Sequence, residues 1–342
     1  MGFITKNWKL LAAIAGIGIA REVWQRSHML ALPDKVVLIT GGSRGLGLAI
    51  AEEFARQGAK LVLCARQEDE LERARLKLLE MESDVLTIAC DVTKPEDAQR
   101  AVDQATAHFG RVDILVNDAG IISAGPQQTL TREDFEESMN VMLWGIFNTT
   151  MAVLPQMKAR HDGRIVNITS IGGKVSVPHL LPYSSAKFAA TGFSQGLRAE
   201  LARDGITVTT VAPGLLRTGS QINTTMKGSE HRTEYTLFTL LDTLPISSIS
   251  AQRAARQIVT ATRRGTAELL ISAQAQIAAR VYGAFPGTTT DILSLVNRFL
   301  PRGTGSASYQ GKDSETPVTR SFLTRLGQRA SHTYNEQSNT KS

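Results

Sequence analysis

The sequence predicts an α/β fold in which a doubly wound parallel sheet of about seven strands carries helices on both faces. Two observations support this prediction. From Pro33 onward, short apolar runs alternate with longer segments that have helical periodicity. The apolar runs are continuous, which is typical of strands buried on both faces. The chain has 342 residues, 42% of them hydrophobic, and can therefore bury a sizeable core.

Strand and helix candidates follow one another along the chain. The predicted strands are Val36–Thr40, Leu61–Cys64, Val85–Ala89, Ile114–Val116, Ile165–Ile168, Thr207–Val211 and Glu268–Ile271. The segments with helical periodicity are Leu46–Gln57, Glu68–Met81, Pro95–Phe109, Arg132–Arg160 and 249–264. Strands that alternate with helices form βαβ units, and these place the strands in parallel. Residues 214–247 lack a clear period, and we expect them to form an irregular segment that determines substrate choice.

These patterns divide the chain into four parts. Residues 31–272 form the α/β domain, and residues 273–301 contain two apolar stretches that predict a helical C-terminal extension. Residues 302–342 are rich in Ser, Thr, Gln, Asn and Arg, and we expect a disordered basic tail. Residues 1–30 form an N-terminal apolar and basic leader.

The leader contains an uninterrupted apolar run, residues 10–20, with Trp8 before it and Trp24 after it. An ordinary membrane-spanning helix needs about 20 residues, so the run is too short for one. It fits the apolar region of a signal peptide cleaved after Ala20, a short membrane anchor, or a leader packed on the body. Tryptophans and basic residues on both sides favour a membrane interface, and we expect an uncleaved anchor.

The net charge of +6 belongs to the two ends of the chain. Residues 1–26 carry four Lys or Arg and one Glu, and residues 302–342 carry six Lys or Arg and three Asp or Glu, so each end is +3 and the body is neutral. A nucleic-acid-binding domain would carry its positive charge on a folded face, so we expect no nucleic acid partner. Cys64 and Cys90 follow apolar strands and are expected to be reduced core thiols, and no Cys/His spacing predicts a metal site.

A glycine-rich loop joins the first predicted strand to the first predicted helix. Its sequence is Gly41-Gly42-Ser43-Arg44-Gly45-Leu46-Gly47. Glycines at this position permit a tight turn and let the backbone approach a pyrophosphate, which the free N–H groups of the helix N-terminus then bind. No Gly-Lys-Ser/Thr follows, so this is not a Walker loop. The loop therefore predicts a dinucleotide site.

The end of the second strand indicates which dinucleotide binds. An acidic residue there would bind the ribose 2′-hydroxyl of NAD. The sequence instead has Cys64-Ala65-Arg66. Arg66 and Arg44 together could hold a 2′-phosphate through charge-assisted hydrogen bonds. We therefore expect the cofactor to be NADP(H).

Tyr183 and Lys187 lie in the segment Tyr-Ser-Ser-Ala-Lys, four residues apart. In a helix this spacing puts both side chains on one face. A tyrosine has an ordinary pKa of about 10, and a cation within about 4–6 Å lowers it. Lys187 is therefore expected to lower the pKa of Tyr183, which would act as a general acid or base.

With these motifs identified, the chain resembles the short-chain dehydrogenase/reductase family over roughly residues 33–271. The matching motifs are Thr40-Gly41-x-x-x-Gly45-x-Gly47, Cys90-Asp91-Val92, Asn117-Asp118-Ala119-Gly120, Asn140, Ser170, Tyr183-x-x-x-Lys187 and Pro213-Gly214-x-x-x-Thr218. Asp118 departs from the family, which has a second asparagine there, and this puts a backbone-bracing hydrogen bond in doubt.

The resemblance implies a Rossmann-like fold and a set of site residues. The implied catalytic residues are Asn140, Ser170, Tyr183 and Lys187. Ser170 would orient the substrate oxygen, Asn140 would hold a water that links Lys187 to solvent, and Lys187 would bind the nicotinamide ribose. The implied cofactor contacts are Gly41, Ser43, Arg44, Gly45, Leu46, Gly47, Arg66, Asp91, Val92, Asn117, Ala119, Gly120, Tyr183, Lys187, Pro213, Gly214 and Thr218. Family members often form homodimers or homotetramers.

The expected function is therefore an NADP(H)-dependent oxidoreductase that interconverts an alcohol and a ketone or aldehyde. Apolar residues within 214–247 suggest an apolar substrate. Two alternatives are a non-catalytic dinucleotide sensor or scaffold on the same fold, and a sugar-nucleotide epimerase or dehydratase, whose glycine loop usually has a different spacing. The N-terminal anchor would place the enzyme at the cytoplasmic side of a membrane, and the alternative is a soluble cytoplasmic enzyme.

Overall fold

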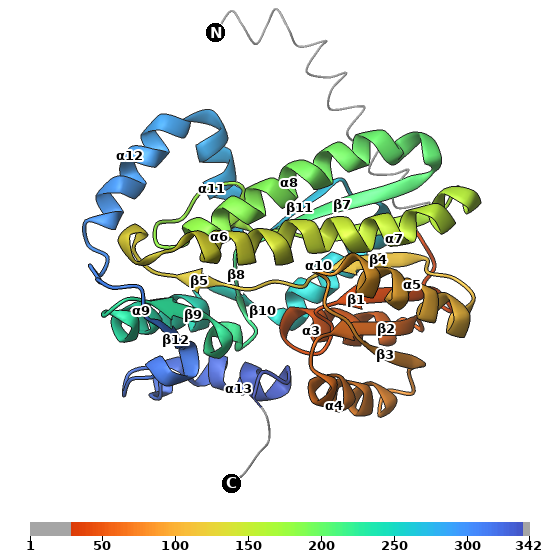
Figure 1. The fold of residues 1–342 in the computed structure, drawn as a ribbon, viewed down its shortest axis with the longest axis horizontal. Coiled ribbons are helices and arrows are strands. Elements are labelled where there is room, and N and C mark those ends of the chain that lie inside the picture. Colours follow the sequence, from red (N-terminus) through yellow and green to blue (C-terminus); the bar gives the residue numbers. More distant parts are fainter. Residues whose placement is uncertain (1–28, 338–342) are drawn as a thin grey trace, which may run out of the picture.

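The computed structural model describes residues 29–337 and confirms the predicted fold class (Figure 1). Residues 1–28, which hold the predicted signal peptide or anchor, lie outside the described residues, as do residues 338–342. Within the described part of the chain, no helix is both long enough and apolar enough to cross a membrane.

The central sheet has seven parallel strands in the order β11-β7-β6-β4-β1-β2-β3. They are β1 (Val36–Thr40), β2 (Lys60–Ala65), β3 (Val85–Ala89), β4 (Ile114–Asn117), β6 (Gly163–Ile168), β7 (Ile206–Pro213) and β11 (Glu268–Ile271). The chain order reverses between β1 and β4. The loops that leave these two strands part at such a switch point, and ligands bind in the crevice there.

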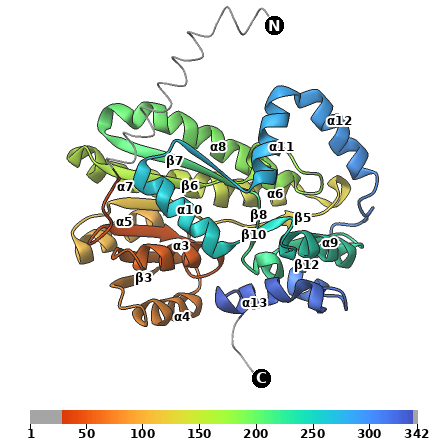
Figure 2. The same cartoon turned by 180° about the vertical axis from the view of Figure 1, so that it is seen from behind.

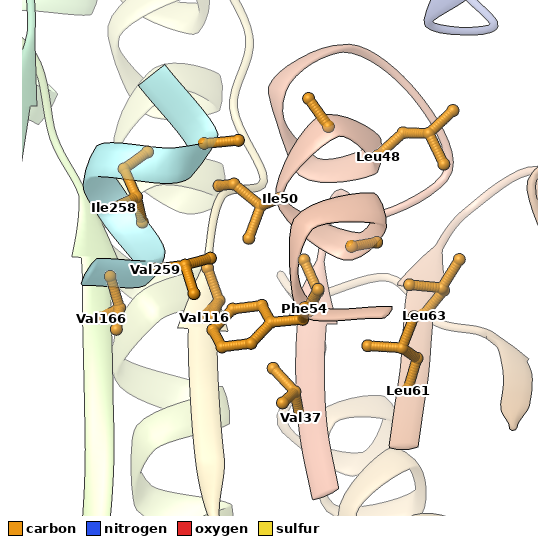
Figure 3. Packing of buried hydrophobic residues seen from close by; sticks show 14 of the residues in the cluster. Val37, Leu48, Ile50, Phe54, Leu61, Leu63, Val116, Val166, Ile258 and Val259 are labelled. Carbon is orange, nitrogen blue, oxygen red and sulfur yellow. The ribbon is translucent and has the colours of Figure 1, made fainter. Parts of the chain in front are cut away.

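Helices cover both faces of the sheet (Figures 1 and 2). One face packs on α3 (Gly45–Ala55), α4 (Glu68–Leu79) and α10 (Ala251–Arg264), and the other on α5 (Pro95–Phe109), α7 (Gly145–Arg160) and α8 (Leu181–Leu201). Figure 3 shows the first of these cores, where Phe54 of α3 lies against Val37, Val116 and Val259. Two covered faces explain why the strands appear as continuous apolar runs in the sequence.

The long helix predicted over Arg132–Arg160 is interrupted in its middle. Helix α6 (Arg132–Met139) and helix α7 are joined by a π-helical segment, η2 (Asn140–Trp144). Such wider turns are frequent at functional sites, where they change the direction of a side chain. The first residue of this one is Asn140, a predicted catalytic residue.

Residues 214–247 are more regular than their composition suggested. They form β8 (Leu215–Arg217), β9 (Thr225–Lys227) and helix α9 (His231–Thr243), so the expectation of an irregular segment was wrong for α9. The buried face of α9 is mostly polar, with Glu234, Thr239, Asp242 and Thr243 beside Tyr235. A helix that buries polar residues leaves no apolar period in the sequence.

The expected disorder of residues 302–342 was wrong for 302–337. This segment contains β12 (Ser308–Gln310), which pairs with β9, and helix α13 (Arg325–Thr333). It is held mainly by hydrogen bonds of Ser and Thr side chains, and Ser314 and Thr324 are fully buried. Composition could not reveal this, because the polar residues that predict disorder are the ones that make the contacts.

Two helices, α11 (Ala273–Ala284) and α12 (Pro286–Asn297), form the segment before the tail. They project from the body beside α8 and carry exposed apolar side chains (Figures 1 and 2). These exposed residues are Ile277, Val281, Phe285, Ile292, Leu295 and Val296, and Phe299 follows them.

Candidate active site

Helix α8 brings Tyr183 and Lys187 together, as the spacing of the two residues predicted. Both lie in its first two turns, and the Lys187 Nζ atom is 5.8 Å from the centroid of the Tyr183 ring. Lys187 is buried, and its ammonium donates a 2.8 Å hydrogen bond to the Ile168 carbonyl at the end of β6. The end of a sheet strand therefore fixes the position of the cation under the tyrosine.

Ser170 follows the same strand and completes this group. Its hydroxyl accepts a 3.0 Å hydrogen bond from the Gly172 N–H, and it is also hydrogen-bonded to Tyr183. A Cβ atom on Gly172 would lie 3.1 Å from the Tyr183 ring, so the absence of a side chain there lets the turn close over the tyrosine. Ser170, Tyr183 and Lys187 form one cluster, and we name it the Tyr–Lys cluster.

The charge state of this cluster differs from the sequence-based expectation. The pKa of Tyr183 is raised, because burial outweighs its hydrogen bond with Ser170 and because Asp118 and Asp242 repel the phenolate. The sequence-based expectation was a lowered pKa for Tyr183, and in this structure the net shift has the opposite direction because burial is its largest cause. Burial also lowers the pKa of Lys187, to about 8, which weakens it as a source of positive charge.

Asp118 is the residue that departs from the family motif, and it lies close to the cluster. Burial raises the pKa of its carboxyl to about 8, Lys187 opposes this rise, and Glu336 adds to it. Its backbone N–H donates to the Thr40 hydroxyl over 3.2 Å, which ties the end of β4 to the end of β1. The Thr40 hydroxyl thus accepts the hydrogen bond that braces the backbone here. The Asp118 carboxylate, which stands where the family has an asparagine side chain, faces the glycine loop.

Asn140 does not touch the Tyr–Lys cluster directly. Among the described residues no hydrogen bond joins its side chain to Lys187. It lines an open cavity of about 370 Å³ together with Arg66, Asp91 and Thr93. This places Asn140 between the expected catalytic group and the expected adenosine site.

The glycine loop has the shape that the sequence predicted. Gly41 and Gly45 adopt positive φ angles of 70° and 58°, a region that glycine enters without strain. A Cβ atom on Gly47 would lie 2.1 Å from the Gly41 carbonyl oxygen and 3.0 Å from the Asp118 carboxylate. The loop closes on the start of α3 only because Gly47 has no side chain, and the helix begins at Gly45, just before Leu46.

Arg44, one of the two predicted 2′-phosphate residues, is already in ionic contact with an acid. The Glu70 carboxylate accepts a 2.9 Å hydrogen bond from Arg44 and a 3.0 Å hydrogen bond from Ser43. Arg66 is exposed at the mouth of the 370 Å³ cavity. Glu70 of α4 thus contacts two residues of the glycine loop, and sequence reasoning did not identify it.

The remaining predicted cofactor residues line the carboxyl edge of the sheet. Asp91 is held by a 2.8 Å hydrogen bond from the Thr93 hydroxyl, and Val92 packs on Gly145. The Asn117 side chain is turned inward, where it donates to Asn167 over 2.9 Å and accepts from Thr149 over 2.7 Å. Its side chain therefore braces β4 and β6.

Pro213 is the last residue of β7, two other predicted positions follow that strand, and two follow β4. The N–H of Gly214, which follows Pro213, donates to the Ile271 carbonyl over 3.0 Å, and the Thr218 hydroxyl is bonded to Ser220 over 2.8 Å. Ala119 and Gly120 lie at the crevice. If Gly41 carried a Cβ atom, that atom would lie 3.0 Å from the Ala119 backbone, and a Cβ atom on Gly120 would lie 3.9 Å from Lys187 Nζ.

The C-terminal segment adds residues that sequence reasoning missed. The Tyr334 carbonyl accepts a 2.8 Å hydrogen bond from the Gly45 N–H, Asn335 donates to the Ser43 carbonyl over 2.9 Å, and Glu336 lies 3.5 Å from Arg44. Ser43 and Asn335 are 292 residues apart in the sequence. A contact between such distant residues leaves no local motif, so the sequence could not reveal these three residues.

With the fold and the site described, comparison with known proteins becomes informative. The family model described as short chain dehydrogenase matches residues 35–228. The chain belongs to the short-chain dehydrogenase family. Members of this family are oxidoreductases that bind a nicotinamide dinucleotide, which agrees with the glycine loop and the Tyr–Lys cluster.

Two similar relatives are insect proteins called "Dehydrogenase/reductase SDR family protein 7-like". The one from Anopheles gambiae is 41% identical over 56% of this chain and 62% of its own length. The one from Drosophila melanogaster is 34% identical over 75% of this chain and 80% of its own length. The chain thus spans less than two thirds of the first relative.

A solved short-chain dehydrogenase structure matches the fold. It is L-sorbose reductase from Gluconobacter frateurii, determined in complex with NADPH and L-sorbose. The TM-score is 0.62 at 29% identity, and the match covers 71% of this chain and 96% of that chain.

The closure of the glycine loop on α3 gives a testable prediction for this short-chain dehydrogenase. Gly47→Ala is expected to abolish dinucleotide binding in isothermal titration, because its Cβ atom would lie 2.1 Å from the Gly41 carbonyl and must push the loop away. Gly192→Ala in α8 is the matched control. It meets no atom within 4 Å and should leave binding unchanged. Normal binding by Gly47→Ala would contradict the role assigned to the loop.

Proposed function

We propose that the protein is an NADP(H)-dependent oxidoreductase that interconverts an alcohol and a ketone or aldehyde, with Tyr183 as the general acid and base. The observation that carries this proposal is the Tyr–Lys cluster, placed by α8 and β6 at the crevice that the glycine loop borders. The cofactor supplies or accepts the hydride when it is bound.

The residues present fit a dinucleotide. The contact between Gly41 and Gly47 leaves a backbone cradle with no side chain, and the Gly45 N–H stands at the start of α3. Backbone N–H groups and the helix dipole stabilise a pyrophosphate at such a position. In this proposal Arg44 and Arg66 hold the 2′-phosphate, which displaces the Glu70 carboxylate from Arg44.

The chemistry of the protein side chains follows from the cluster. In reduction, the Tyr183 hydroxyl donates its proton to the oxygen of the forming alkoxide, and in oxidation the phenolate removes the proton of the alcohol. The Ser170 hydroxyl donates a hydrogen bond to the same oxygen and fixes its position. Lys187 stabilises the phenolate and binds the nicotinamide ribose, and Asn140 holds a water that connects Lys187 to solvent.

An apolar substrate fits the cavity next to α8. This cavity, of about 560 Å³, is bounded by Pro178 and His179 before α8, by Leu181 at its start, and by Tyr282 and Leu293 of α11 and α12. Its size is within the range of small-molecule sites. These apolar side chains share the lining with polar ones, among them His179, which is hydrogen-bonded to Glu234 of α9.

The proposal is tested first by Tyr183→Phe. This change removes the proton donor at almost constant volume, so turnover in an NADPH-oxidation assay over hydrophobic ketones and aldehydes should fall by at least about a hundredfold. Binding of NADPH should stay the same. Tyr309→Phe removes the same atom from a tyrosine of β12 and should leave turnover unchanged. Activity of Tyr183→Phe within about tenfold of the parent would refute the assignment.

Absence of any turnover in the parent, with NADPH still bound, would favour the sensor alternative.

The choice of NADP(H) is tested by the double variant Arg44→Gln and Arg66→Gln. Loss of two charge-assisted contacts should reduce NADPH affinity at least about tenfold more than NADH affinity. The ratio of the two affinities is the readout, because it cancels changes that act on both dinucleotides alike. Arg75→Gln, at an α4 arginine that is paired with Glu72, is the control for lost charge. Equal losses for the two dinucleotides would show that the arginines do not bind the 2′-phosphate.

We also propose that the enzyme associates with the cytoplasmic side of a membrane through its N-terminal segment. The exposed apolar side chains of α11 and α12, with Arg280, Arg298 and Arg302 among them, support a second contact with anionic lipid. The full chain should sediment with membranes after cell fractionation, and a chain that begins at Leu30 should sediment less. Full-length protein found entirely in the supernatant would rule out the association.

A further inference from the structure

The tip of the C-terminal segment, residues Tyr334–Glu336, lies directly on the glycine loop. The Tyr334 carbonyl accepts the Gly45 N–H over 2.8 Å, and a Cβ atom on Gly45 would lie 2.6 Å from the Glu336 Oε1 atom. The first N–H of α3 and the space beside it are the groups that a pyrophosphate needs. In this structure the protein's own chain holds them.

Glu336 presents an anion at this position. Its carboxylate is buried, accepts a 2.7 Å hydrogen bond from Asn223 and lies 3.5 Å from the Arg44 guanidinium. A carboxylate at a helix N-terminus, next to an arginine, satisfies the same electrostatic requirement as a phosphate. The interaction is thus of the kind that the cofactor would make.

The tip is aimed at the loop by a specific turn. Asn335 has a φ of 57°, a left-handed conformation that asparagine tolerates better than most residues. Its side chain donates to the Ser43 and Glu70 carbonyls over 2.9 and 3.0 Å, and accepts from Arg73 Nε over 2.7 Å. All the hydrogen-bonding groups of this amide are therefore used on the loop and on α4.

The helix before the tip is anchored separately. A Cβ atom on Gly219 would lie 2.3 Å from the Ser331 backbone, and one on Gly327 would lie 2.5 Å from the Thr243 hydroxyl, so α13 packs closely on the body. Figures 1 and 2 show α13 below the glycine-loop end of α3, beside α4. Tyr334 also packs its buried side chain on the core, so release of the whole tip requires that this side chain leave the core while α13 keeps its own contacts.

We propose that the tip is an autoinhibitory plug, which occupies the pyrophosphate position of the dinucleotide site and must leave it before the cofactor binds. This inference rests on the proposed function, since it takes the glycine loop as the dinucleotide site. The apparent affinity for the dinucleotide then equals the intrinsic affinity multiplied by the fraction of molecules whose tip is released. Any condition that frees the tip activates the enzyme.

Other charges nearby make release feasible. Glu70, Asp118 and Asp242 all interact unfavourably with the Glu336 carboxylate. Burial raises the pKa of Glu336 to about 7, although Arg44 and Asn223 oppose this rise. An anion held among three acids is displaced more easily than one held by cations alone.

The test uses full-length protein with variants that loosen the tip without touching the loop. Asn335→Ala removes three hydrogen bonds and no charge, and Arg73→Ala removes the α4 partner of Asn335. Arg73→Ala should tighten NADPH binding by about fivefold and Asn335→Ala by at least about tenfold, measured by titration calorimetry. Arg73→Ala is decisive, because loss of a positive charge would by itself weaken the binding of an anionic dinucleotide.

Arg75→Ala is the matched control for Arg73→Ala. It removes the same charge from the same helix, but its partner is Glu72, and among the described residues no hydrogen bond or ion pair joins it to the tip. It should leave NADPH affinity unchanged or slightly weaker. The plug is refuted if the NADPH affinity of Arg73→Ala equals that of Arg75→Ala and the NADPH affinity of Asn335→Ala equals that of the parent.

Hydrogen exchange gives an independent readout of release. The N–H group of Glu336, at the end of the tip, donates to the Ser331 carbonyl of α13 over 2.9 Å when the tip is docked. Saturating NADPH should speed the exchange of this N–H group in the parent, and unchanged or slower exchange would overturn the plug. If the parent and the variants bind NADPH equally well, the plug is refuted and the proposed function is not. If none of them binds a dinucleotide, the proposed function is refuted as well.

Discussion

The nucleotide half of the structure depends on one close backbone approach. The carbonyl of Gly41 occupies the space that a side chain of Gly47 would need, at 2.1 Å from its Cβ position. This contact lets α3 start immediately under the end of β1, with its first N–H groups directed into the crevice. Thr40 and Asp118 then join the ends of β1 and β4 through a hydrogen bond. The glycines of the loop carry no side chain that could cover these N–H groups. A site of this kind binds an anion selectively.

The electrostatic character of the crevice follows from what fills that site. Asp118, Asp242 and Glu336 all have raised pKa values, each chiefly because of burial, and Glu336 raises the other two further. The same acids, Asp118 and Asp242, raise the pKa of Tyr183. The docked tip therefore acts against the proposed chemistry because it occupies the anion position. Its carboxylate also raises the pKa of Asp118 and Asp242, which makes these two acids weaker and less ionised.

Much of the central domain could be predicted from the sequence, because its elements have local signals. The strands at Val36–Thr40, Val85–Ala89 and Glu268–Ile271 have the predicted limits, since each is a continuous apolar run bounded by polar residues. The spacing of Tyr183 and Lys187 likewise fixes their common face within one helix. The π-helical turn at Asn140 has no such signal, and the predicted helix simply continues through it.

The parts that could not be predicted depend on contacts between distant residues. Helix α9 buries Glu234 and Asp242, and a polar buried face has no apolar period. The tail forms because Ser308–Gln310 pairs with β9 and because Asn335 finds partners on Ser43, Glu70 and Arg73. The pKa of Tyr183 could not be obtained from its distance to Lys187 alone, because burial and two acids decide its direction.

The strength of the docked tip limits what it can do. If the tip is docked in about 99% of molecules, the apparent affinity for the dinucleotide falls about a hundredfold, which corresponds to about 2.7 kcal/mol of docking free energy. Three hydrogen bonds of Asn335 and the contact with Arg44 are together of this order, since each contributes about 0.5–1.5 kcal/mol and the repulsion among the buried acids subtracts from the sum. The contacts are therefore strong enough to hold the tip on the loop and weak enough for a phosphate, with more charge and more acceptor oxygens, to replace it.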